Sequence, residues 1–327
     1  MSDCLVIGGG VIGMMSARML ALSGAQVVLL DQRECGRESS WAGGGIVSPL
    51  YPWHYDDLTN ELSFESQAMY QQLCQALFDS SGIDPEYQKS GLLMIDEFDT
   101  IQAQAWMKRY QVDYQKHDNG AFFSNIASVR NPRLLQALRA DIAKLGVQII
   151  EHTTVKEVIT KADIAVGVAT QSEDIYTDNV VICAGAWSSQ LTDLDERVFP
   201  MKGQMIIFKP GPVNLKHIIL DRGRYIVPRV DGKILVGSTM EDVGFNREVD
   251  EPTKQSLYDF ACEHLPMLAG LEIEKHWSGF RPATKSGKVI LGRDSKYQNL
   301  FINTGHFRNG INMAPASAIR ITQLINE

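Results

Sequence analysis

Three glycines and one carboxylate near the beginning of the chain have the spacing of a dinucleotide-binding site. Gly8, Gly10 and Gly13 form a GxGxxG pattern, and Asp31 follows about 20 residues later, as such sites require. The first glycine permits a tight turn, the second lets the backbone approach a pyrophosphate, and the third lets a helix pack closely on a strand. A carboxylate at Asp31 can accept hydrogen bonds from both hydroxyls of a ribose. These residue types therefore predict that the chain binds a dinucleotide.

The elements that must position these residues can be read on either side of them. Residues 4–7 form an apolar run that favours a buried parallel strand. The residues between Gly13 and Gly24 have a helical pattern, and the N-terminus of that helix would offer amide donors to the phosphates. Residues 27–30 predict a second strand. This strand–helix–strand context favours a cofactor site over a glycine-rich turn without a ligand.

The segment RESSWAGGGIVSP distinguishes between the two common dinucleotides. A nicotinamide enzyme usually continues into alternating strands and helices, whereas this chain enters a loop with Ser39, Ser40 and the run Gly43–Gly45. Hydroxyls and bare backbone there could complete a phosphate cradle and let a flat ring lie against the main chain. The alternative is a flexible serine–glycine loop. We expect FAD rather than a nicotinamide cofactor.

A second group of polar residues lies late in the chain. The stretch GHFRNGI places His306, Arg308 and Asn309 between two glycines, just before an apolar run. Amides at the beginning of the helix expected there can stabilise negative charge on a reduced flavin. We expect His306 to orient the turn rather than to carry a proton.

Two arginines could hold the carboxylate of a substrate. A guanidinium is planar and permanently charged, and it can donate two parallel hydrogen bonds to a carboxylate. Arg281 stands in GFRPA, where a β-rich segment ends, and Arg308 stands in the glycine-flanked turn. The alternatives are structural: a surface salt bridge for Arg281, and a cap on the end of a strand for Arg308.

The composition narrows the classes of protein to which the chain can belong. Its 327 residues favour two domains. A net charge of −8 and the lack of a basic run argue against a nucleic-acid partner, because no excess of cations is present to displace phosphate counterions. Five scattered cysteines without a CxxC pair favour reduced thiols in the cytoplasm. We expect no metal site, because the seven histidines lack ligand spacing, and no membrane span.

Several motifs together resemble one family, the FAD-dependent oxidases of amines and amino acids that include D-amino-acid oxidase, sarcosine oxidase and glycine oxidase. After the two N-terminal segments come VVICAGAWS (180–188), YIVPRVDGKILVGSTMED (225–242), GFRPATKSGKVILGR (279–293) and GHFRNGI, in the family's order. The similarity extends from residue 4 to about residue 320. RESSWAGGGIVSPLYPW and GHFRNGI are together most similar to the glycine oxidase branch of thiamine biosynthesis.

The resemblance implies an α/β fold of the glutathione-reductase-like, amino-acid oxidase type. A Rossmann-type FAD-binding domain would be discontinuous and comprise residues 1–80, 129–196 and 281–327. An α+β substrate-binding domain with an antiparallel sheet would comprise residues 81–128 and 197–280. Short β-rich segments separated by turns such as DG agree with an antiparallel sheet.

The resemblance also implies roles for individual residues. Arg281 would clamp the substrate carboxylate, Tyr225 would offer it a hydroxyl, and Arg308 would face the substrate cavity. Met240 would form a bulky wall that favours glycine or sarcosine over larger amino acids, although ordinary core packing is its alternative. Gly223 replaces a histidine of the family's glycine oxidases. The residues expected at the cofactor are Gly8, Gly10, Val11, Ile12, Gly13, Asp31, Gln32, Ser39, Ser40, Ala42, Gly43, Gly44, Gly45, Val155, Ala184, Gly185, Trp187, His306, Arg308, Asn309, Gly310 and Ile311.

The activity implied by the resemblance is oxidative deamination of glycine, in which glycine, water and oxygen give glyoxylate, ammonia and hydrogen peroxide. The imine formed first could supply thiazole formation in thiamine biosynthesis. Sarcosine, a small D-amino acid, or transfer of electrons to a quinone are alternatives. A flavin-binding protein without turnover is disfavoured, because it would not need Arg281 and Tyr225. We nominate no catalytic acid or base, and we expect non-covalent FAD. The resemblance leaves room for a homo-oligomer and for a link to thiazole synthase.

Overall fold

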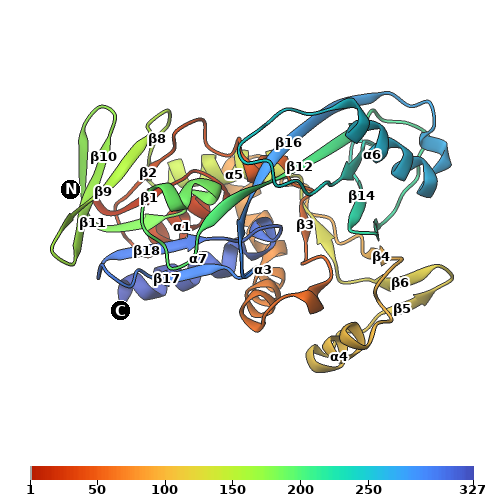
Figure 1. Cartoon of the computed structure of the whole chain (residues 1–327), viewed down its shortest axis with the longest axis horizontal. Helices are drawn as coiled ribbons and strands as arrows, with labels where there is room; N and C mark the ends of the chain where they lie inside the picture. Colours follow the sequence, from red (N-terminus) through yellow and green to blue (C-terminus); the bar gives the residue numbers. More distant parts are fainter. Residues whose placement is uncertain (1) are drawn as a thin grey trace.

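The computed structural model describes residues 2–327, and their strands form two eight-stranded sheets and one two-stranded sheet. The first large sheet lies on the left of Figure 1 and has the order β17-β18-β11-β1-β2-β8. All of these pairs are parallel except the edge pair β17–β18. The bounds of the strands are β1 Ser2–Ile7, β2 Val27–Leu30, β8 Gln148–Ile150, β11 Asp174–Ile182, β17 Ile290–Arg293 and β18 Leu300–Thr304. This arrangement confirms the predicted Rossmann-type half of the fold.

The two faces of this sheet are covered differently. Helices α1 (Val11–Leu22), α3 (Asp57–Ser81), α5 (Asn131–Lys144) and α7 (Gly310–Asn326) lie on one face and pack against one another. The antiparallel strands β9 (Val155–Lys161) and β10 (Ile164–Thr170) continue from β11 and cover part of the other face. Burial on both sides explains why the strands of the parallel core are nearly continuous apolar runs.

The second large sheet has the order β16-β12-β15-β14-β13-β4-β6-β5 and is antiparallel except at β13–β4. Its strands are β4 Leu92–Met94, β5 Gln115–His117, β6 Gly120–Phe123, β12 Val198–Phe208, β13 Ile218–Asp221, β14 Arg224–Pro228, β15 Ile234–Gly237 and β16 Ile273–Thr284. Helix α6 (Glu251–His264) packs on β12 and β15, and α4 (Ile101–Tyr110) lies at the far end of the molecule in Figure 1. The predicted antiparallel sheet is therefore present.

Two long strands join the halves of the molecule. β12 and β16 pair from Val198–Thr284 to Phe208–Ile273, and they extend toward the first sheet in Figure 1. The 3₁₀ helix η2 (Gly185–Gln190), which follows β11, packs against both. The remaining short elements are α2 Ser39–Ala42, β3 Ile46–Val47, η1 Pro52–His54, β7 Ala127–Ser128 and η3 Pro266–Leu268. Residues at the ends of β12 and β16 can therefore meet residues at the carboxyl ends of the parallel strands.

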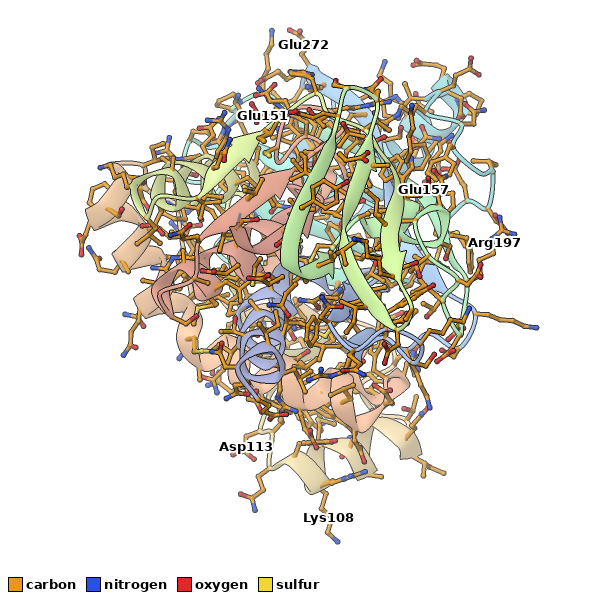
Figure 2. The ribbon with its side chains drawn as sticks, turned by 90° about the vertical axis from the view of Figure 1, so that its left-hand side faces the viewer. Lys108, Asp113, Glu151, Glu157, Arg197 and Glu272 are labelled. Carbon is orange, nitrogen blue, oxygen red and sulfur yellow. The ribbon has the colours of Figure 1, made fainter. Side chains whose placement is uncertain are left out.

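Many of the charged side chains extend from the surface. Figure 2 shows Lys108, Arg197 and Glu272 extending outward from the ribbon.

Within residues 2–327, no helix has the length and apolar character needed to cross a membrane. The same residues contain no cluster of three His, Cys, Asp or Glu side chains that could hold a metal ion. All five cysteines are free thiols.

Candidate active site between the two sheets

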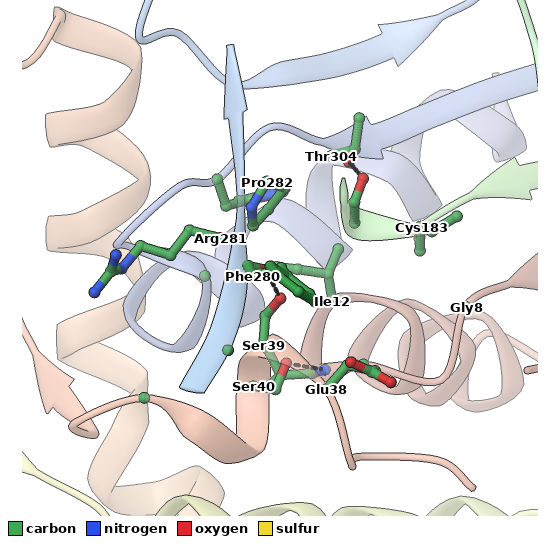
Figure 3. A pocket seen from close by; sticks show the side chains of 18 of the residues that line it. Gly8, Ile12, Glu38, Ser39, Ser40, Cys183, Phe280, Arg281, Pro282 and Thr304 are labelled. Carbon is green, nitrogen blue, oxygen red and sulfur yellow. Dashed lines mark hydrogen bonds between the residues drawn. The ribbon is translucent and has the colours of Figure 1, made fainter. Parts of the chain in front are cut away.

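A cavity lies between the carboxyl ends of the parallel strands and the long strands of the second sheet. It is lined by the beginning of α1, the residues after β2, the loop of residues 38–46, η2, and the turn before α7. On the other side it is lined by Tyr225 of β14 and Arg281 of β16. Figure 3 shows Ser39 and Ser40 below Phe280, Gly8 farther to the right, and the Arg281 side chain extending to the left.

The structure brings together most of the residues that the sequence predicted. The predicted residues that line the cavity are Gly8, Gly10, Val11, Ile12, Asp31, Gln32, Ser39, Ser40, Ala42, Gly43, Gly44, Gly45, Val155, Ala184, Gly185, Trp187, Tyr225, Arg281, His306, Arg308, Gly310 and Ile311. Gly13, Asn309 and Met240 are not part of the lining.

The turn between β1 and α1 is built for close approach of the backbone. Gly8 has a φ of +107°, and a Cβ at this position would overlap the carbonyl oxygen of Cys183 on the neighbouring strand. A Cβ at Gly13 would overlap the carbonyl oxygen of Gly8, so Gly13 acts by letting α1 pack on the turn. Helix α1 begins after Gly10, which has no side chain to cap it. These features fit the pyrophosphate of a dinucleotide, which needs bare backbone and amide donors.

Two serines secure the loop that faces this turn. The Ser40 hydroxyl accepts a hydrogen bond from the amide of Val11 at 3.0 Å, and the Ser39 hydroxyl donates to the carbonyl oxygen of Phe280. Ser40 thus joins the loop to the beginning of α1, while Ser39 joins it to β16 of the second sheet. The predicted second phosphate-binding segment is therefore held against both halves of the molecule.

Asp31 organises the ribose end of the candidate cofactor site. One carboxylate oxygen accepts from the amide of Gly9 at 2.6 Å, and the other accepts from the amide of Arg33 at 2.7 Å. Burial raises the pKa of this carboxyl group, while the two amide bonds act in the opposite direction. Because a carboxylate offers about four lone-pair sites, Asp31 retains acceptor capacity toward the cavity.

We expect Asp31→Ala to weaken FAD binding about tenfold or more, because ribose hydrogen bonds and an anchor of the Gly9 turn are lost together. The preferred amine should not change, since Asp31 lies at the end of β2, away from Arg281. Titration of the apoprotein with FAD measures the first effect, and the ratio of rates on glycine and sarcosine measures the second. Asp3→Ala is the matched control, because Asp3 accepts a backbone amide hydrogen bond at the opposite end of the same sheet. Unchanged FAD affinity would contradict the assignment.

Arg281 reaches the cavity with only neutral hydrogen-bond partners. Its guanidinium donates to the hydroxyl of Ser238 at 2.6 Å and to the carbonyl oxygen of Thr239 at 3.1 Å. Burial and, to a smaller extent, the nearby positive charge of Arg308 together lower its pKa to about 10. The group therefore remains charged at neutral pH but lacks a counter-ion among these partners. A bound carboxylate would supply that counter-ion.

Arg308 is held by a chain of hydrogen bonds from the second sheet. Its guanidinium donates to the carbonyl oxygen of Gly223 at 3.0 Å. The amide of Gly223 in turn donates to the Tyr51 hydroxyl at 2.9 Å, and that hydroxyl donates to Asp96 at 2.7 Å. Gly223, with a φ of +72°, thus offers Arg308 a carbonyl group. Sequence reasoning missed Tyr51 and Asp96, because no local pattern links residues so far apart in the chain.

Tyr51→Phe should loosen the Gly223 turn and raise the KM for the substrate about threefold to tenfold, because the hydrogen bonds of the Tyr51 hydroxyl with the Gly223 amide and with Asp96 are both lost. FAD affinity should stay within twofold of the wild type. Steady-state kinetics at saturating FAD measure the change. Tyr114→Phe is the control, because Tyr114 is an exposed residue, and this substitution should not change the KM. Equal KM values for the wild type and Tyr51→Phe would show that the chain of bonds does not orient Arg308.

The turn before α7 combines a buried histidine with the beginning of a helix. His306 is buried, and its Nε2 atom lies 3.0 Å from the hydroxyl of Ser317 within α7. Burial lowers its pKa to about 3, so the ring is neutral at physiological pH. Asn309 is buried at the N-cap of α7 rather than in the cavity wall. Gly310 and Ile311 line the cavity at the N-terminus of the helix, where amide groups can face negative charge.

The prediction for Met240 is wrong. Its side chain is 62% exposed and does not line the cavity. The residues on either side of it, Thr239 and Glu241, hydrogen-bond to the backbone of β12, and the Met240 side chain faces solvent. Met205 of β12 lines the cavity instead, and the Tyr225 hydroxyl donates to its sulfur at 3.7 Å. The methionine beside the predicted carboxylate site is therefore on a different strand from the one expected.

A dinucleotide-binding turn and two arginines line one cavity between a parallel and an antiparallel sheet. This combination is that of an FAD-dependent oxidoreductase. Residues 3–324 match the family model described as DAO, FAD dependent oxidoreductase, so the chain belongs to this family and FAD is its cofactor. It is 40% identical to a glycine oxidase of Pseudomonas aeruginosa over 98% of this chain and 94% of the relative. It is 33% identical to the bifunctional protein ThiO/ThiG of a Nostoc species, over 99% of this chain and 53% of that protein.

Solved structures agree with these sequence relationships. The crystal structure of a glycine oxidase from Bacillus cereus superposes with a TM-score of 0.92 at 28% identity, covering 100% of this chain and 95% of the other. The crystal structure of iminodiacetate oxidase from a Chelativorans species has a TM-score of 0.87 at 24% identity, over 99% of this chain and 95% of the other. The second likeness supports the fold alone. The enzyme class and the fold class that the sequence predicted are confirmed.

Proposed function

We propose that the chain catalyses the oxidative deamination of glycine: glycine, water and oxygen give glyoxylate, ammonia and hydrogen peroxide. The observation that carries the proposal is the position of Arg281. This arginine has hydrogen bonds only to neutral groups, and it lines the same cavity as the residues expected to bind FAD. The glycine oxidases of Pseudomonas, similar over nearly their full length, support this choice of substrate.

Each residue of the cavity has a physical task in this reaction. FAD, which the turn before α1 and the loop with Ser39 and Ser40 would hold, would supply the redox chemistry of the reaction. Arg281 holds the carboxylate, and the Tyr225 hydroxyl adds a hydrogen bond, so that the Cα–H bond is held in one orientation. Arg308 adds positive potential beside them. The chain needs no side-chain base if the amine binds in its neutral form, and the imine product reacts with water.

The alternatives differ in the substituent on the amine and in the electron acceptor. Sarcosine and small D-amino acids carry the same carboxylate, so Arg281 would serve them equally. Met205 and the Tyr225 ring, both buried beside the cavity, limit the space available to a side chain. That restriction favours glycine or sarcosine over larger amino acids. A dehydrogenase that passes electrons to a quinone would use the same site.

The proposal extends to organisation and partners. The FAD-binding domain would comprise residues 1–80, 129–196 and 281–327, and the substrate domain residues 81–128 and 197–280, since the two sheets follow these ranges with β16 passing between them. FAD would be held without a covalent bond.

Relatives with a ThiO/ThiG name support a role in supplying the imine for thiazole formation and a link to thiazole synthase. Free thiols support a cytoplasmic location. A homo-oligomer stays a prediction.

The test is a comparison of substrates with and without oxygen. The purified holoenzyme is mixed in air with glycine, sarcosine and D-alanine while hydrogen peroxide is followed, and the absorbance of the flavin is then followed without oxygen. We expect peroxide with glycine, and the ranking of the three substrates measures the size of the pocket. Bleaching without peroxide would indicate a dehydrogenase. No bleaching with any of the three would refute the substrate class.

A further inference from the structure

A third arginine lies directly behind the glycine loop of the cavity. Arg229, directly after β14, is not part of the cavity lining. Its guanidinium donates to the carbonyl oxygen of Gly44 at 2.9 Å and to that of Val129 at 3.0 Å. The Val129 amide donates back to the carbonyl oxygen of Gly45 at 2.8 Å. One side chain of the second sheet thus joins two backbone segments of the cofactor half.

The contact also reaches the substrate side of the cavity, because Tyr225 lies on β14 and Arg229 directly follows this strand. The Arg229 amide still donates to the carbonyl oxygen of Lys233 at 2.9 Å, so the alternation of the strand continues and places residues 225, 227 and 229 on one face. A Cβ at Gly44 would lie 2.5 Å from the Tyr225 ring, which shows that the ring packs directly on this glycine. Tyr225 and Arg229 therefore hold Gly44 between them, one through its Cα and the other through its carbonyl oxygen.

The hydrogen bonds of Arg229 differ in kind from those of the arginine beside it. The neighbouring Arg130 forms salt bridges with Glu86 at 3.2 Å and Asp231 at 2.9 Å, whereas both hydrogen bonds of Arg229 go to neutral oxygens. Burial lowers the pKa of Arg229 to about 10, so the group stays charged at neutral pH. A cation withdrawn from water without a carboxylate partner is costly. Stronger hydrogen bonds from a charged donor to the two carbonyl groups offset part of that cost.

Turning the Gly44 carbonyl toward Arg229 has a consequence for the cavity. A peptide group is planar, so fixing its carbonyl oxygen on one side fixes the following amide on the other side. The carbonyl oxygen of Gly44 points away from the cavity, and the amide of Gly45 is thereby directed to the opposite side. A ring with negative charge against this loop would meet an amide donor rather than a carbonyl oxygen.

We propose that Arg229 is a positioning residue that fixes the Gly43–Gly45 loop against Tyr225 and so shapes the FAD cradle and the carboxylate end of the substrate cavity together. It acts through the loop and touches neither ligand. The part of this inference that concerns the substrate rests on the proposed glycine oxidation, and the part that concerns FAD does not.

The test compares Arg229→Met, Arg229→Lys and Arg224→Met. Arg224 is the matched control, because it lies on β14 and donates to the carbonyl oxygen of Ser256 at 3.0 Å, away from the cavity. Apoprotein is titrated with FAD by flavin fluorescence, and the KM for glycine is measured at saturating FAD. The thermal unfolding midpoint of each apoprotein is recorded as a measure of general damage.

Arg229→Met should weaken FAD binding roughly tenfold or more, because two hydrogen bonds from a charged donor are lost, and it should raise the KM for glycine. Arg229→Lys should recover part of the FAD affinity, since an ammonium group can serve one carbonyl. Arg224→Met should bind FAD within twofold of the wild type. An Arg229→Met variant with wild-type FAD affinity would overturn the proposal, as would equal losses in Arg224→Met. If the wild type binds FAD but does not oxidise glycine, only the proposed function fails, because the FAD titrations still decide the role of Arg229.

Discussion

Arg281→Ala is expected to raise the KM for glycine about 30-fold to 4,000-fold while FAD stays bound. Removing one partner of a buried, hydrogen-bonded charge pair costs about 2–5 kcal/mol, and each 1.4 kcal/mol is a factor of ten. The loss should be large here because the other partners of Arg281, Ser238 and Thr239, cannot hold a carboxylate in its place. Arg308 and Tyr225 would remain in the cavity, but the Arg308 guanidinium already donates to the carbonyl oxygen of Gly223, so the substrate carboxylate would lose its paired hydrogen bonds.

The measurement combines steady-state kinetics with the absorbance of bound flavin. Arg109→Ala is the control, since Arg109 is an exposed arginine of α4 paired with Asp57 on the surface, and its KM should equal that of the wild type. Added guanidinium ion should restore part of the activity of Arg281→Ala, because it can occupy the space left by the side chain. Arg281→Lys should lie between the two, since an ammonium keeps the charge but not the paired hydrogen bonds. A KM within threefold of the wild type would contradict the clamp.

Gly8→Ala is expected to abolish retention of FAD during purification and to destabilise the apoprotein by about 3–5 kcal/mol, in the range of the most damaging single substitutions. Two penalties act together. A φ of +107° is unfavourable for any residue with a Cβ atom, and that Cβ would overlap the carbonyl oxygen of Cys183. Because the partner is backbone of a central strand, β1 and β11 would have to separate at the place where the phosphates bind.

Substitution of a second glycine distinguishes the cost of backbone strain from the cost of the steric overlap. Gly24 also has a positive φ, +97°, but a Cβ there would meet nothing within 4 Å. Gly24→Ala should therefore cost only the backbone strain, about 1–2 kcal/mol, and should keep its FAD. Urea unfolding of both apoproteins and the ratio of flavin to protein absorbance measure the two effects. Similar losses in both variants would mean that close approach to Cys183 is unimportant.

The sequence by itself determined the parts of this protein that depend on local chemistry. The GxGxxG turn, the strand on either side of the first helix and the position of Asp31 depend on residues that are close in the chain, so their spacing predicts the structure. The same holds for the turn before α7, where two glycines and a buried His306 precede the helix. Membership of the FAD-dependent family followed from these segments in their order.

Only the tertiary structure decided how the second sheet meets the first. Met240 was expected in a cavity wall, but the path of the chain after β15 turns it to solvent, and Met205 takes the inner position. The bonds from Tyr51 to Gly223 and from Arg229 to Gly44 connect residues that are more than a hundred positions apart. Such contacts arise when two folded layers pack, and their energy depends on the distance and direction of single atoms. The spacing of residues within one segment of the sequence therefore cannot predict that geometry.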